Sequence, residues 1–370
     1  MAPAAQRVPG FRMADQVAAN GFHGLGGTPS RLGSGGPDTK TKLPTPGQAA
    51  PLRKCRLGIS FGPESLLYSF PSENPMNARR LSEFSRSLRM LTEGAASGSI
   101  GIVQPVQARE DELLVFHTRE FVDQVKRIST TGEGSLNDAD TPAFKGIYEA
   151  SLYPVGNTLN GLRLLCRGSF DHFFNPVGGL HHSAPDGARG FCVFNDSVIA
   201  ISKAINEFKL RSVAYVDIDA HHGDGVFYEF EAEPRVIVGD IHEDGRFLYP
   251  GTGRESEAGT GFAAGTKMNI PLLPGSGDQQ FFDAFDKVEE LVRRAEPEMI
   301  FFQCGADGLV GDPITDLRYS SAAHSYAAKK LHQLAHEVCE GKLLAMGGGG
   351  YNPTNVSAAW TAVIKELAGG

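Results

Sequence analysis

The sequence predicts an α/β protein in which a parallel sheet is covered by helices on both faces. Three features of residues 55–370 indicate this fold class: short apolar strand-like runs, helical stretches between them, and polar residues just after several of the runs. Strands that alternate with helices are joined by right-handed crossovers, which place parallel strands side by side. No internal repeat or linker divides this region, so we expect a single domain over residues 55–370.

The individual elements follow from the spacing of apolar residues. Short apolar runs predict strands at residues 57–61, 113–116, 213–219, 235–241, 299–304 and 343–346. Apolar residues at helical spacing predict helices at residues 77–91, 119–128, 157–165, 198–208, 279–294 and 322–338.

Residues 1–54 have a different composition, rich in Gly, Pro, Ala and Thr and poor in large apolar side chains. Such a segment cannot bury enough surface to offset the entropy of ordering it, so we expect a disordered N-terminal tail. Its basic bias leaves open an organellar targeting peptide, although no convincing amphipathic helix accompanies it. An upstream extension, with Met13 as an alternative start, is also open.

Composition and charge exclude several classes of function. The net charge of −8 argues against a nucleic-acid-binding protein, because the basic surface that attracts phosphates is missing. No apolar run is long enough for a membrane span. The five scattered cysteines show no CxxC spacing, so neither a disulfide framework nor a cysteine zinc site is indicated. These features favour a soluble protein of the reducing cytoplasm.

Potential metal ligands follow two of the predicted strands. Asp217, Asp219 and His221 come at the end of one strand, and Asp307 comes just past another. Residues two apart on a strand point the same way, and ligands of open α/β sheets bind at the carboxyl ends of strands. A single Asp here would more simply cap a turn. Asp219, His221 and Asp307 together would leave a fourth position open, as in a catalytic metal site. This donor set suits Zn²⁺, with Fe²⁺, Co²⁺ or Mn²⁺ as alternatives.

Candidate acid–base groups lie in two glycine-containing loops. His181 and His182 follow two glycines, and histidine changes charge near neutral pH. Asp217 and Asp224 are the carboxylates that could orient them. Tyr351 ends a run of four glycines and could donate its phenol O–H to a developing oxyanion, as an alternative to a packing role. The pattern suits amide hydrolysis assisted by a metal.

Six sequence blocks together resemble the zinc-dependent histone deacetylase superfamily, which includes acetoin utilisation proteins and acetylpolyamine amidohydrolases. They occur in the family's order and extend the resemblance from Arg56 to the C-terminus. The blocks are Gly-Gly-Leu-His-His at 178–182, Gly-Phe-Cys at 190–192 with Asn-Asp at 195–196, and the segments 217–225, 249–253, 303–312 and 347–351.

The resemblance implies the arginase–deacetylase fold, a single α/β domain around an eight-stranded parallel sheet. It implies one zinc ion on Asp219, His221 and Asp307. The implied catalytic residues are His181 and His182 beside the attacking water, Asp217 and Asp224 as their respective carboxylate partners, and Tyr351 on the substrate carbonyl. Which histidine is the base and which the acid stays open at this stage.

The resemblance also implies a narrow tunnel for an acyl-lysine-like chain. Its substrate-binding residues would be Gly190, Phe191 and Tyr249, with Asp140 as the acid at the rim that holds the substrate backbone. Tyr249 stands where many members have Phe. Ile314 occupies the position of a gatekeeping Glu in polyamine-specific members, and an apolar residue there cannot attract a second ammonium group.

A monovalent-cation site, most simply for K⁺, is implied beneath the zinc. Asp240 stands where eukaryotic deacetylases have Ser, so this site departs from the family pattern. Asp240 could still bind K⁺ together with Asp217 and the backbone of Asp219 and His221. The additional carboxylate makes the site more negative than its family counterpart.

The leading functional hypothesis is a zinc hydrolase that removes acetyl or other acyl groups from lysine side chains of proteins or peptides. Alternatives are the deacylation of acetylpolyamines or another small acylated amine, and a catalytically inactive module that binds acyl-lysine. An arginase-type binuclear manganese hydrolase would leave His181, His182 and Tyr351 unexplained. The substrate, its acyl length, the relevance of histones and the oligomeric state stay open.

Overall fold

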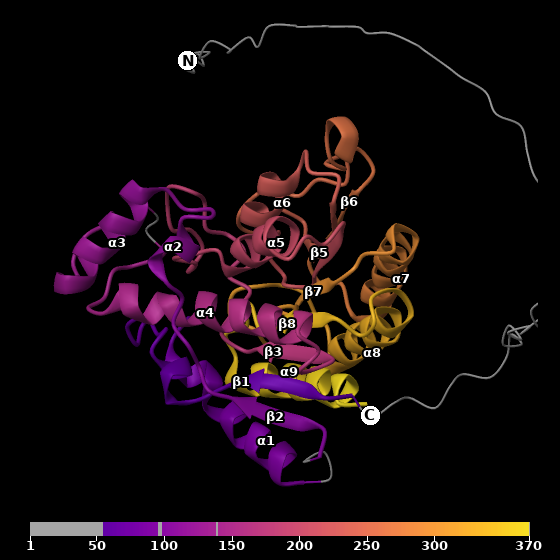
Figure 1. Cartoon of the computed structure of the whole chain (residues 1–370), viewed down its shortest axis with the longest axis horizontal. Coiled ribbons are helices and arrows are strands. Elements are labelled where there is room, and N and C mark those ends of the chain that lie inside the picture. The colour runs from indigo at the N-terminus through magenta and orange to yellow at the C-terminus, as the bar shows by residue number, and fades with distance from the viewer. Residues whose placement is uncertain (1–54, 95–97, 138–139, 370) are drawn as a thin grey trace, which may run out of the picture. The chain divides into compact units, whose positions relative to one another are not determined.

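The computed structural model describes residues 55–94, 98–137 and 140–369. Its strands are β1 Leu57–Ser60, β2 Ile100–Val103, β3 His172–Asn175, β4 Val213–Asp217, β5 Val236–Glu243, β6 Lys267–Leu272, β7 Ile300–Gln303 and β8 Leu343–Met346. They form one eight-stranded sheet in the order β2-β1-β3-β8-β7-β4-β5-β6 (Figure 1). Every pair of neighbouring strands in it is parallel. The predicted N-terminal tail, residues 1–54, lies outside the described residues.

Helices cover both faces of this sheet. They are α1 Ser82–Glu93, α2 Glu110–Leu113, α3 Arg119–Thr131, α4 Ile147–Cys166, α5 Asp196–Asn206, α6 Asp224–Phe230, α7 Asp278–Ala295, α8 Ser321–Val338 and α9 Pro353–Leu367. Three short 3₁₀ helices join them: η1 Pro63–Leu66, η2 Ala78–Leu81 and η3 Gly261–Ala263. Helices α1, α7, α8 and α9 pack on one face, whereas α3, α4, α5 and α6 pack on the other. The predicted fold class, a single α/β domain around an eight-stranded parallel sheet, is confirmed.

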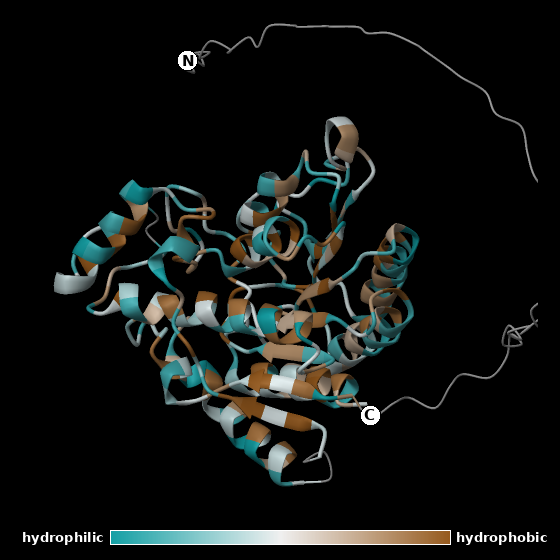
Figure 2. Ribbon diagram, in the orientation of Figure 1, coloured by the Kyte–Doolittle hydropathy of each residue, from teal (hydrophilic) through white to brown (hydrophobic). Residues whose placement is uncertain are grey.

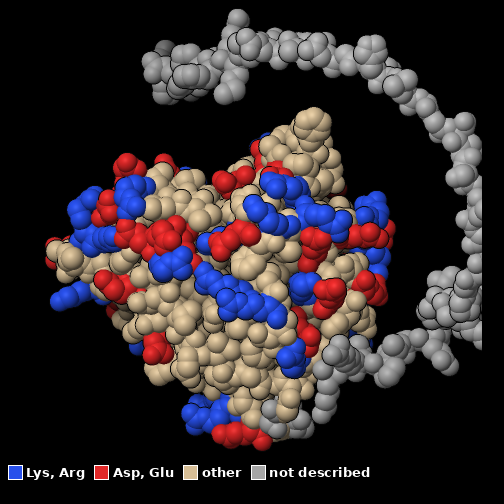
Figure 3. Space-filling view, viewed as in Figure 1, with Lys and Arg blue, Asp and Glu red and all other residues tan. Residues whose placement is uncertain are grey.

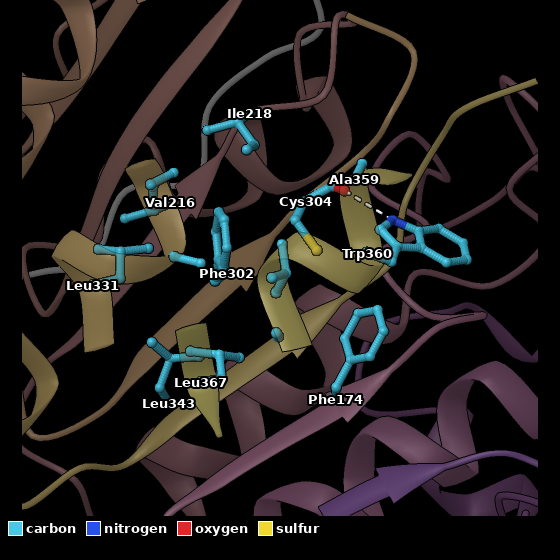
Figure 4. Close-up of a cluster of buried hydrophobic side chains, with 14 of the residues drawn as sticks. Phe174, Val216, Ile218, Phe302, Cys304, Leu331, Leu343, Ala359, Trp360 and Leu367 are labelled. Carbon is cyan, nitrogen blue, oxygen red and sulfur yellow. Dashed lines mark hydrogen bonds between the residues drawn. The ribbon is translucent and has the colours of Figure 1, made fainter. Parts of the chain in front are cut away.

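The alternation of side chains along each strand divides the apolar core between the two faces. In β7, Ile300 and Phe302 join the core beneath α7, α8 and α9, whereas Phe301 faces the opposite core. Figure 4 shows part of the first core, where Phe174 and Trp360 lie beside each other. The Trp360 indole N–H donates to the carbonyl of Cys304 at 3.1 Å, so the ring also fixes the loop after β7. Figure 2 shows that the strands are mostly apolar, whereas the surrounding helices carry both apolar and hydrophilic residues.

One predicted strand is wrong. Residues 113–116 are not a strand, because the chain there forms α2 and then a turn. The Glu112 side chain accepts from the backbone N–H of Arg109 at 2.9 Å and so caps the start of α2. This local polar contact favours a helical turn, and the short apolar run from Leu113 to Phe116 is too brief to distinguish strand from helix.

Several elements were not predicted. Strands β2, β3 and β6 and helices α6 and α9 have short or interrupted apolar patterns. Strand β6 lies at the edge of the sheet and contains Pro271, a residue that is tolerated at an edge but not at the centre of a sheet. Strand β4 also ends earlier than expected, at Asp217, so Asp219 and His221 lie in the following turn.

The surface, the cysteines and the helices add three observations. Lys and Arg lie interspersed with Asp and Glu over the helices on the face shown in Figure 3. None of the five cysteines, all of which lie among the described residues, forms a disulfide. Among the described residues, no helix is long and apolar enough to cross a membrane.

The order of the strands brings the predicted functional loops together. Strands β3, β8, β7 and β4 are consecutive neighbours at the centre of the sheet, and β5 follows β4. The loops that leave the carboxyl ends of β3, β8, β7 and β4 contain the paired histidines, the glycine run, Asp307 and the Asp219–His221 turn, respectively, and Asp240 lies within β5 beside Asp217. Because the strands are parallel, all these loops meet at one edge, which we call the carboxyl edge.

Candidate metal and catalytic centre

Asp219, His221 and Asp307 form a compact group of ligand atoms at the carboxyl edge. One atom from each residue lies within 4.8 Å of the others, and all three residues are buried. His221 Nδ1 is 3.1 Å from Asp219 Oδ1 and 3.1 Å from Asp307 Oδ2. One nitrogen and two carboxylate oxygens are ligands that Zn²⁺ accepts, with room for a fourth.

The electrostatics of this group fit a divalent cation. Burial alone would lower the pKa of His221, but its hydrogen bonds and the charges of Asp219 and Asp307 raise the pKa to about 10. Two buried carboxylates thus attract a positive charge into a space where little water can screen them. A metal ion bound there would take the place of the proton on the imidazole.

Further contacts hold the two carboxylates in place. Asp219 Oδ2 accepts from Gln303 Nε2 at 2.8 Å and from the backbone N–H of Gly349 at 2.7 Å. Asp307 Oδ1 accepts from the backbone N–H of Ala220 at 2.8 Å. These bonds satisfy the outer oxygens of the carboxylates, a common way of orienting metal ligands. The contribution of Gln303 was not predicted, because a lone Gln at the end of an apolar run has no sequence signature.

Glycine is required where the loops approach Asp219 and Asp307, the candidate metal ligands. A Cβ atom added to Gly305 would lie 2.1 Å from Asp219 Oδ2, and one added to Gly349 would lie 2.2 Å from Asp307 Oδ2. Any side chain at these positions would displace a carboxylate. The sequence predicts a loop at the glycine run, residues 347–350. That these glycines are needed for close packing is evident only from the structure.

Arg80 is a buried residue of the site that the sequence did not reveal. Its guanidinium donates to three successive carbonyls of the glycine run, at 2.6 Å from Gly348, 2.9 Å from Gly349 and 2.8 Å from Gly350. Arg80 is only 7% exposed and lies in η2, far from the glycine run in sequence. It therefore fixes the loop that presents Tyr351.

The paired histidines each contact one of the predicted carboxylates. His181 Nδ1 is 2.8 Å from Asp217 Oδ2, and His182 Nδ1 is 2.6 Å from Asp224 Oδ1. The two Nε2 atoms face each other at 3.0 Å. Tyr215, which was not predicted, donates its hydroxyl to Asp217 Oδ2 at 2.6 Å.

The environments of the two histidines differ. Burial lowers the pKa of His181, but the charges of Asp217 and Asp219 outweigh this effect and raise its pKa to about 10. Burial and the neighbouring charge of His181 lower the pKa of His182 to about 4. Two imidazole nitrogens 3.0 Å apart cannot both carry a proton without repulsion. The proton therefore resides on His181, and His182 is neutral near pH 7.

A narrow pocket of about 80 Å³ leads from the surface to this centre. Its lining includes the five residues expected to bind substrate, namely Asp140, Gly190, Phe191, Tyr249 and Ile314, together with three polar residues at its floor, namely His182, His221 and Tyr351. The walls are mostly aromatic or apolar and the floor is polar, as in a slot for an aliphatic chain that ends in a polar group. His181 is not part of this lining, so of the paired histidines it is His182 that lines the pocket.

Tyr351 and Ile314 are positioned by the same carboxylate. The backbone N–H of Tyr351 donates to Asp312 Oδ2 at 2.8 Å, and that of Ile314 donates to Asp312 Oδ1 at 3.0 Å. The ring of Tyr351 lies edge-on to Phe191 with centroids 5.8 Å apart. Burial and the charges of Asp307 and Asp219 raise the pKa of Tyr351 well above its ordinary value, which keeps the phenol protonated. It is then a hydrogen-bond donor.

Asp240 lies directly beside Asp217 in the register of β4 and β5. Its Oδ2 accepts from the backbone N–H of Gly223 at 2.9 Å, while its buried Oδ1 has no hydrogen-bond partner. Burial and the charge of Asp217 raise the pKa of Asp240 well above its usual range. A buried carboxylate oxygen without a partner fits either a proton or a monovalent cation.

Comparisons with known proteins agree with this geometry. The family model "Histone deacetylase domain" matches residues 74–367. The acetoin utilization protein AcuC of Bacillus subtilis (strain 168) is 36% identical over 321 residues, covering 84% of this chain and 81% of that protein. AcuC of Staphylococcus xylosus is 32% identical over 321 residues, covering 84% of this chain and 82% of that protein. The crystal structure of the HDA15 HD domain superposes with a TM-score of 0.77 at 27% identity, covering 85% of this chain and 90% of that one. The resemblance seen in the sequence blocks is confirmed.

Proposed function

Because the chain belongs to the histone deacetylase family, we propose that this deacetylase removes acetyl groups from the ε-amine of lysine in proteins or peptides. The observation that carries the proposal is the pocket of about 80 Å³ with His182, His221 and Tyr351 at its polar floor. An extended lysine side chain is thin and apolar until its terminal amide. It therefore suits a slot with apolar walls and a polar end.

We propose Zn²⁺ as the metal, held by Asp219, His221 and Asp307. When bound there, the ion would polarise the amide carbonyl and lower the pKa of water for attack. The ligand atoms are grouped within 4.8 Å, and no thiolate is among them. This donor set favours a metal that tolerates mixed nitrogen and oxygen coordination.

His182 is assigned as the base. It lines the pocket, its Nδ1 contacts Asp224, and its pKa is lowered to about 4, so the imidazole is neutral and can take up a proton from the attacking water. The C–N bond then breaks as a proton passes from the histidine pair to the leaving lysine amine. His181 is assigned a supporting role, since its charge stabilises negative charge that develops nearby.

Tyr351 is assigned to the oxyanion. Its protonated hydroxyl can donate to the carbonyl oxygen as the carbon becomes tetrahedral. A preorganised donor of this kind acts mainly on the transition state, because the negative charge on the oxygen develops only there.

Substrate recognition is assigned to the pocket mouth. Asp140 is an exposed carboxylate there and can accept backbone N–H groups of a peptide. Ile314 presents an apolar side chain where a second ammonium group of a polyamine would arrive. An ammonium beside an apolar side chain loses hydration without gaining a partner, which disfavours polyamines.

A small acylated amine is the second candidate substrate. Its favouring observation is the small size of the pocket, which accepts the acylated arm of either substrate.

We further propose that Asp217 and Asp240, with the backbone of Asp219 and His221, bind K⁺. The buried Asp240 Oδ1, which has no hydrogen-bond partner, supports this proposal.

A substrate profile on the purified, zinc-loaded protein tests these assignments. Acetyl-lysine peptides should be cleaved with a higher kcat/KM than acetylspermidine, and longer acyl groups should be cleaved more slowly. Metal content measured on the same sample relates activity to zinc. Preference for acetylspermidine would overturn the peptide assignment. Activity that requires two equivalents of manganese would overturn the zinc assignment.

A further inference from the structure

A second cluster of metal-binding side chains lies at the opposite edge of the sheet. Cys55 comes just before β1, and His172 is the first residue of β3. These strands are neighbours, with Leu57 in register with His172. His332 and His336 lie one helical turn apart near the end of α8, so their side chains share one face. The four residues therefore meet at the amino ends of the strands, away from the carboxyl edge.

The four side chains converge on a common point. One ligand atom from each lies within 4.8 Å of the other three. His172 Nε2 is 2.9 Å from His332 Nδ1, and Cys55 Sγ is 3.0 Å from His336 Nε2. The three imidazole rings form a nearly regular triangle, with centroid separations of 4.9, 5.2 and 4.9 Å.

Burial and backbone packing hold this arrangement. Cys55, His172 and His332 are at most 2% exposed, whereas His336 is exposed. Gly341, at a φ of 86°, packs against the His336 ring so closely that an added Cβ would lie 2.7 Å from its Cε1 atom. The cluster is thus closed toward the protein interior, with His336 on the side from which an ion would enter.

We propose that Cys55, His172, His332 and His336 bind a second metal ion, for which Zn²⁺ has the best match of donor atoms. Three imidazoles and one thiolate complete a tetrahedral zinc shell. In such a shell, ligand atoms are separated by about 3.3–3.6 Å, from Zn–N and Zn–S distances of about 2.0–2.3 Å. Shifts of a few tenths of an ångström would bring the two close pairs to these separations.

This site is structural rather than catalytic. Four protein ligands leave no position for a water or a substrate. The ion would join the segment before β1, the start of β3 and the end of α8. Since these ligands are assembled only in the folded chain, binding stabilises the folded state.

The test uses the full-length chain and separates the two metal sites through their donor atoms. Wild-type protein, saturated with Zn²⁺ and freed of excess, should hold one more equivalent of zinc than the Cys55→Ser or His336→Ala variant. Exposed Gln333, on the same helix, provides the matched control: Gln333→Ala should retain the wild-type zinc content. Deacetylase turnover should change less than about twofold in all three variants.

Co²⁺ substitution gives a second readout that is independent of activity. Of the two groups of potential ligands among the described residues, the one at the amino ends of the strands is the group with a cysteine, so a thiolate-to-cobalt charge-transfer band in the near ultraviolet reports on that site. The band should be present in wild type, Gln333→Ala and the catalytic-site variant Asp219→Ala, and absent in Cys55→Ser. Zinc at about a hundred times its Kd should raise the Tm of the Asp219→Ala variant by about 5 °C. The double variant Asp219→Ala, Cys55→Ser should show a smaller rise.

Two results would overturn the proposal. The first is equal zinc content in wild type and Cys55→Ser, both correctly folded by circular dichroism. The second is a cobalt spectrum of wild type without the thiolate band. Either one would identify the cluster as a hydrogen-bonded group of neutral side chains. Neither would bear on the deacetylase assignment, which rests on the carboxyl edge.

Discussion

The two edges of the sheet carry two clusters of potential metal ligands with opposite character. At the carboxyl edge, Asp219, His221 and Asp307 lie together, and His221 lines a pocket whose lining also includes His182 and Tyr351. At the opposite edge, where the amino ends of the strands lie, the side chains of Cys55, His172, His332 and His336 converge on one point. Of these four residues, His336 is exposed and the other three are buried. The first group offers three potential ligands next to a pocket, and the second offers four potential ligands.

The comparison shows how the number of protein ligands distinguishes a catalytic metal site from a structural one. Three ligands leave a position at which a substrate can meet the metal, and carboxylates keep the ion a strong Lewis acid. Four neutral or thiolate ligands complete the shell and leave the ion inert. The helix α8 extends between the two clusters: His324 near its start donates to the carbonyl of Gly305 at 2.8 Å, two residues before Asp307, and His336 lies near its end.

The largest expected effect comes from removing one ligand at each edge in turn. Asp219→Ala should lower kcat/KM by at least about 1,000-fold, because the metal contributes several kcal/mol to transition-state stabilisation. Cys55→Ser should leave turnover within about twofold of wild type. Both are measured with an acetyl-lysine peptide, with zinc content determined on the same samples, and Asp307→Ala should reproduce Asp219→Ala. Full activity in Asp219→Ala, or its loss in Cys55→Ser, would contradict the division between the edges.

Tyr351→Phe should have the next largest effect. Loss of one preorganised oxyanion donor typically lowers kcat by about 10²–10³, or roughly 3–4 kcal/mol, while ground-state binding changes little. The variant should stay folded and retain its zinc, since a single hydroxyl is deleted. Steady-state kinetics and peptide affinity provide the measurements. Turnover within a few-fold of wild type would make Tyr351 a packing residue.

The contact between His324 of α8 and the carbonyl of Gly305 can be tested through the pH dependence of stability. Burial lowers the pKa of His324 to about 4 in the folded protein, below its ordinary value of 6.5. Its contribution to stability is therefore complete above pH 6.5 and is lost as the pH falls toward 4, by about 2–3 kcal/mol. Denaturant unfolding from pH 7 to pH 4 should show this loss in wild type and a smaller one in His324→Gln. Equal losses in both proteins would exclude His324 as the titrating group.

The smallest effect concerns selectivity at the pocket mouth. Ile314→Glu should raise the ratio of acetylspermidine to acetyl-lysine peptide cleavage by about tenfold, because a carboxylate partly desolvated at the mouth can pair with an ammonium group. Gln333→Glu adds the same charge near the amino edge and should leave the ratio unchanged. Competition between the two substrates in one reaction measures the ratio directly. An equal shift in both variants would indicate a general effect of net charge.

The sequence by itself determined most of the carboxyl edge. Apolar runs followed directly by Asp217, Asp307 and the glycines before Tyr351 placed the polar groups at strand ends, and parallel strands bring such ends to one edge. Those signals are local, since each motif lies within a few residues of a buried strand. The same kind of local pattern gave a wrong prediction at residues 113–116. A short apolar run there predicted a strand, but the hydrogen bonds of α2 favour a helical turn.

Only the tertiary structure decided which distant residues complete the two sites. Arg80 lies 268 residues from Gly348 in sequence, and Cys55 lies 281 residues from His336. Neither pairing has a fixed spacing, because the intervening chain is determined by the strand order and not by any motif. The spacing of the cysteines therefore indicated no cysteine zinc site. A ligand set assembled across a sheet becomes visible only when β1, β3 and α8 are packed together.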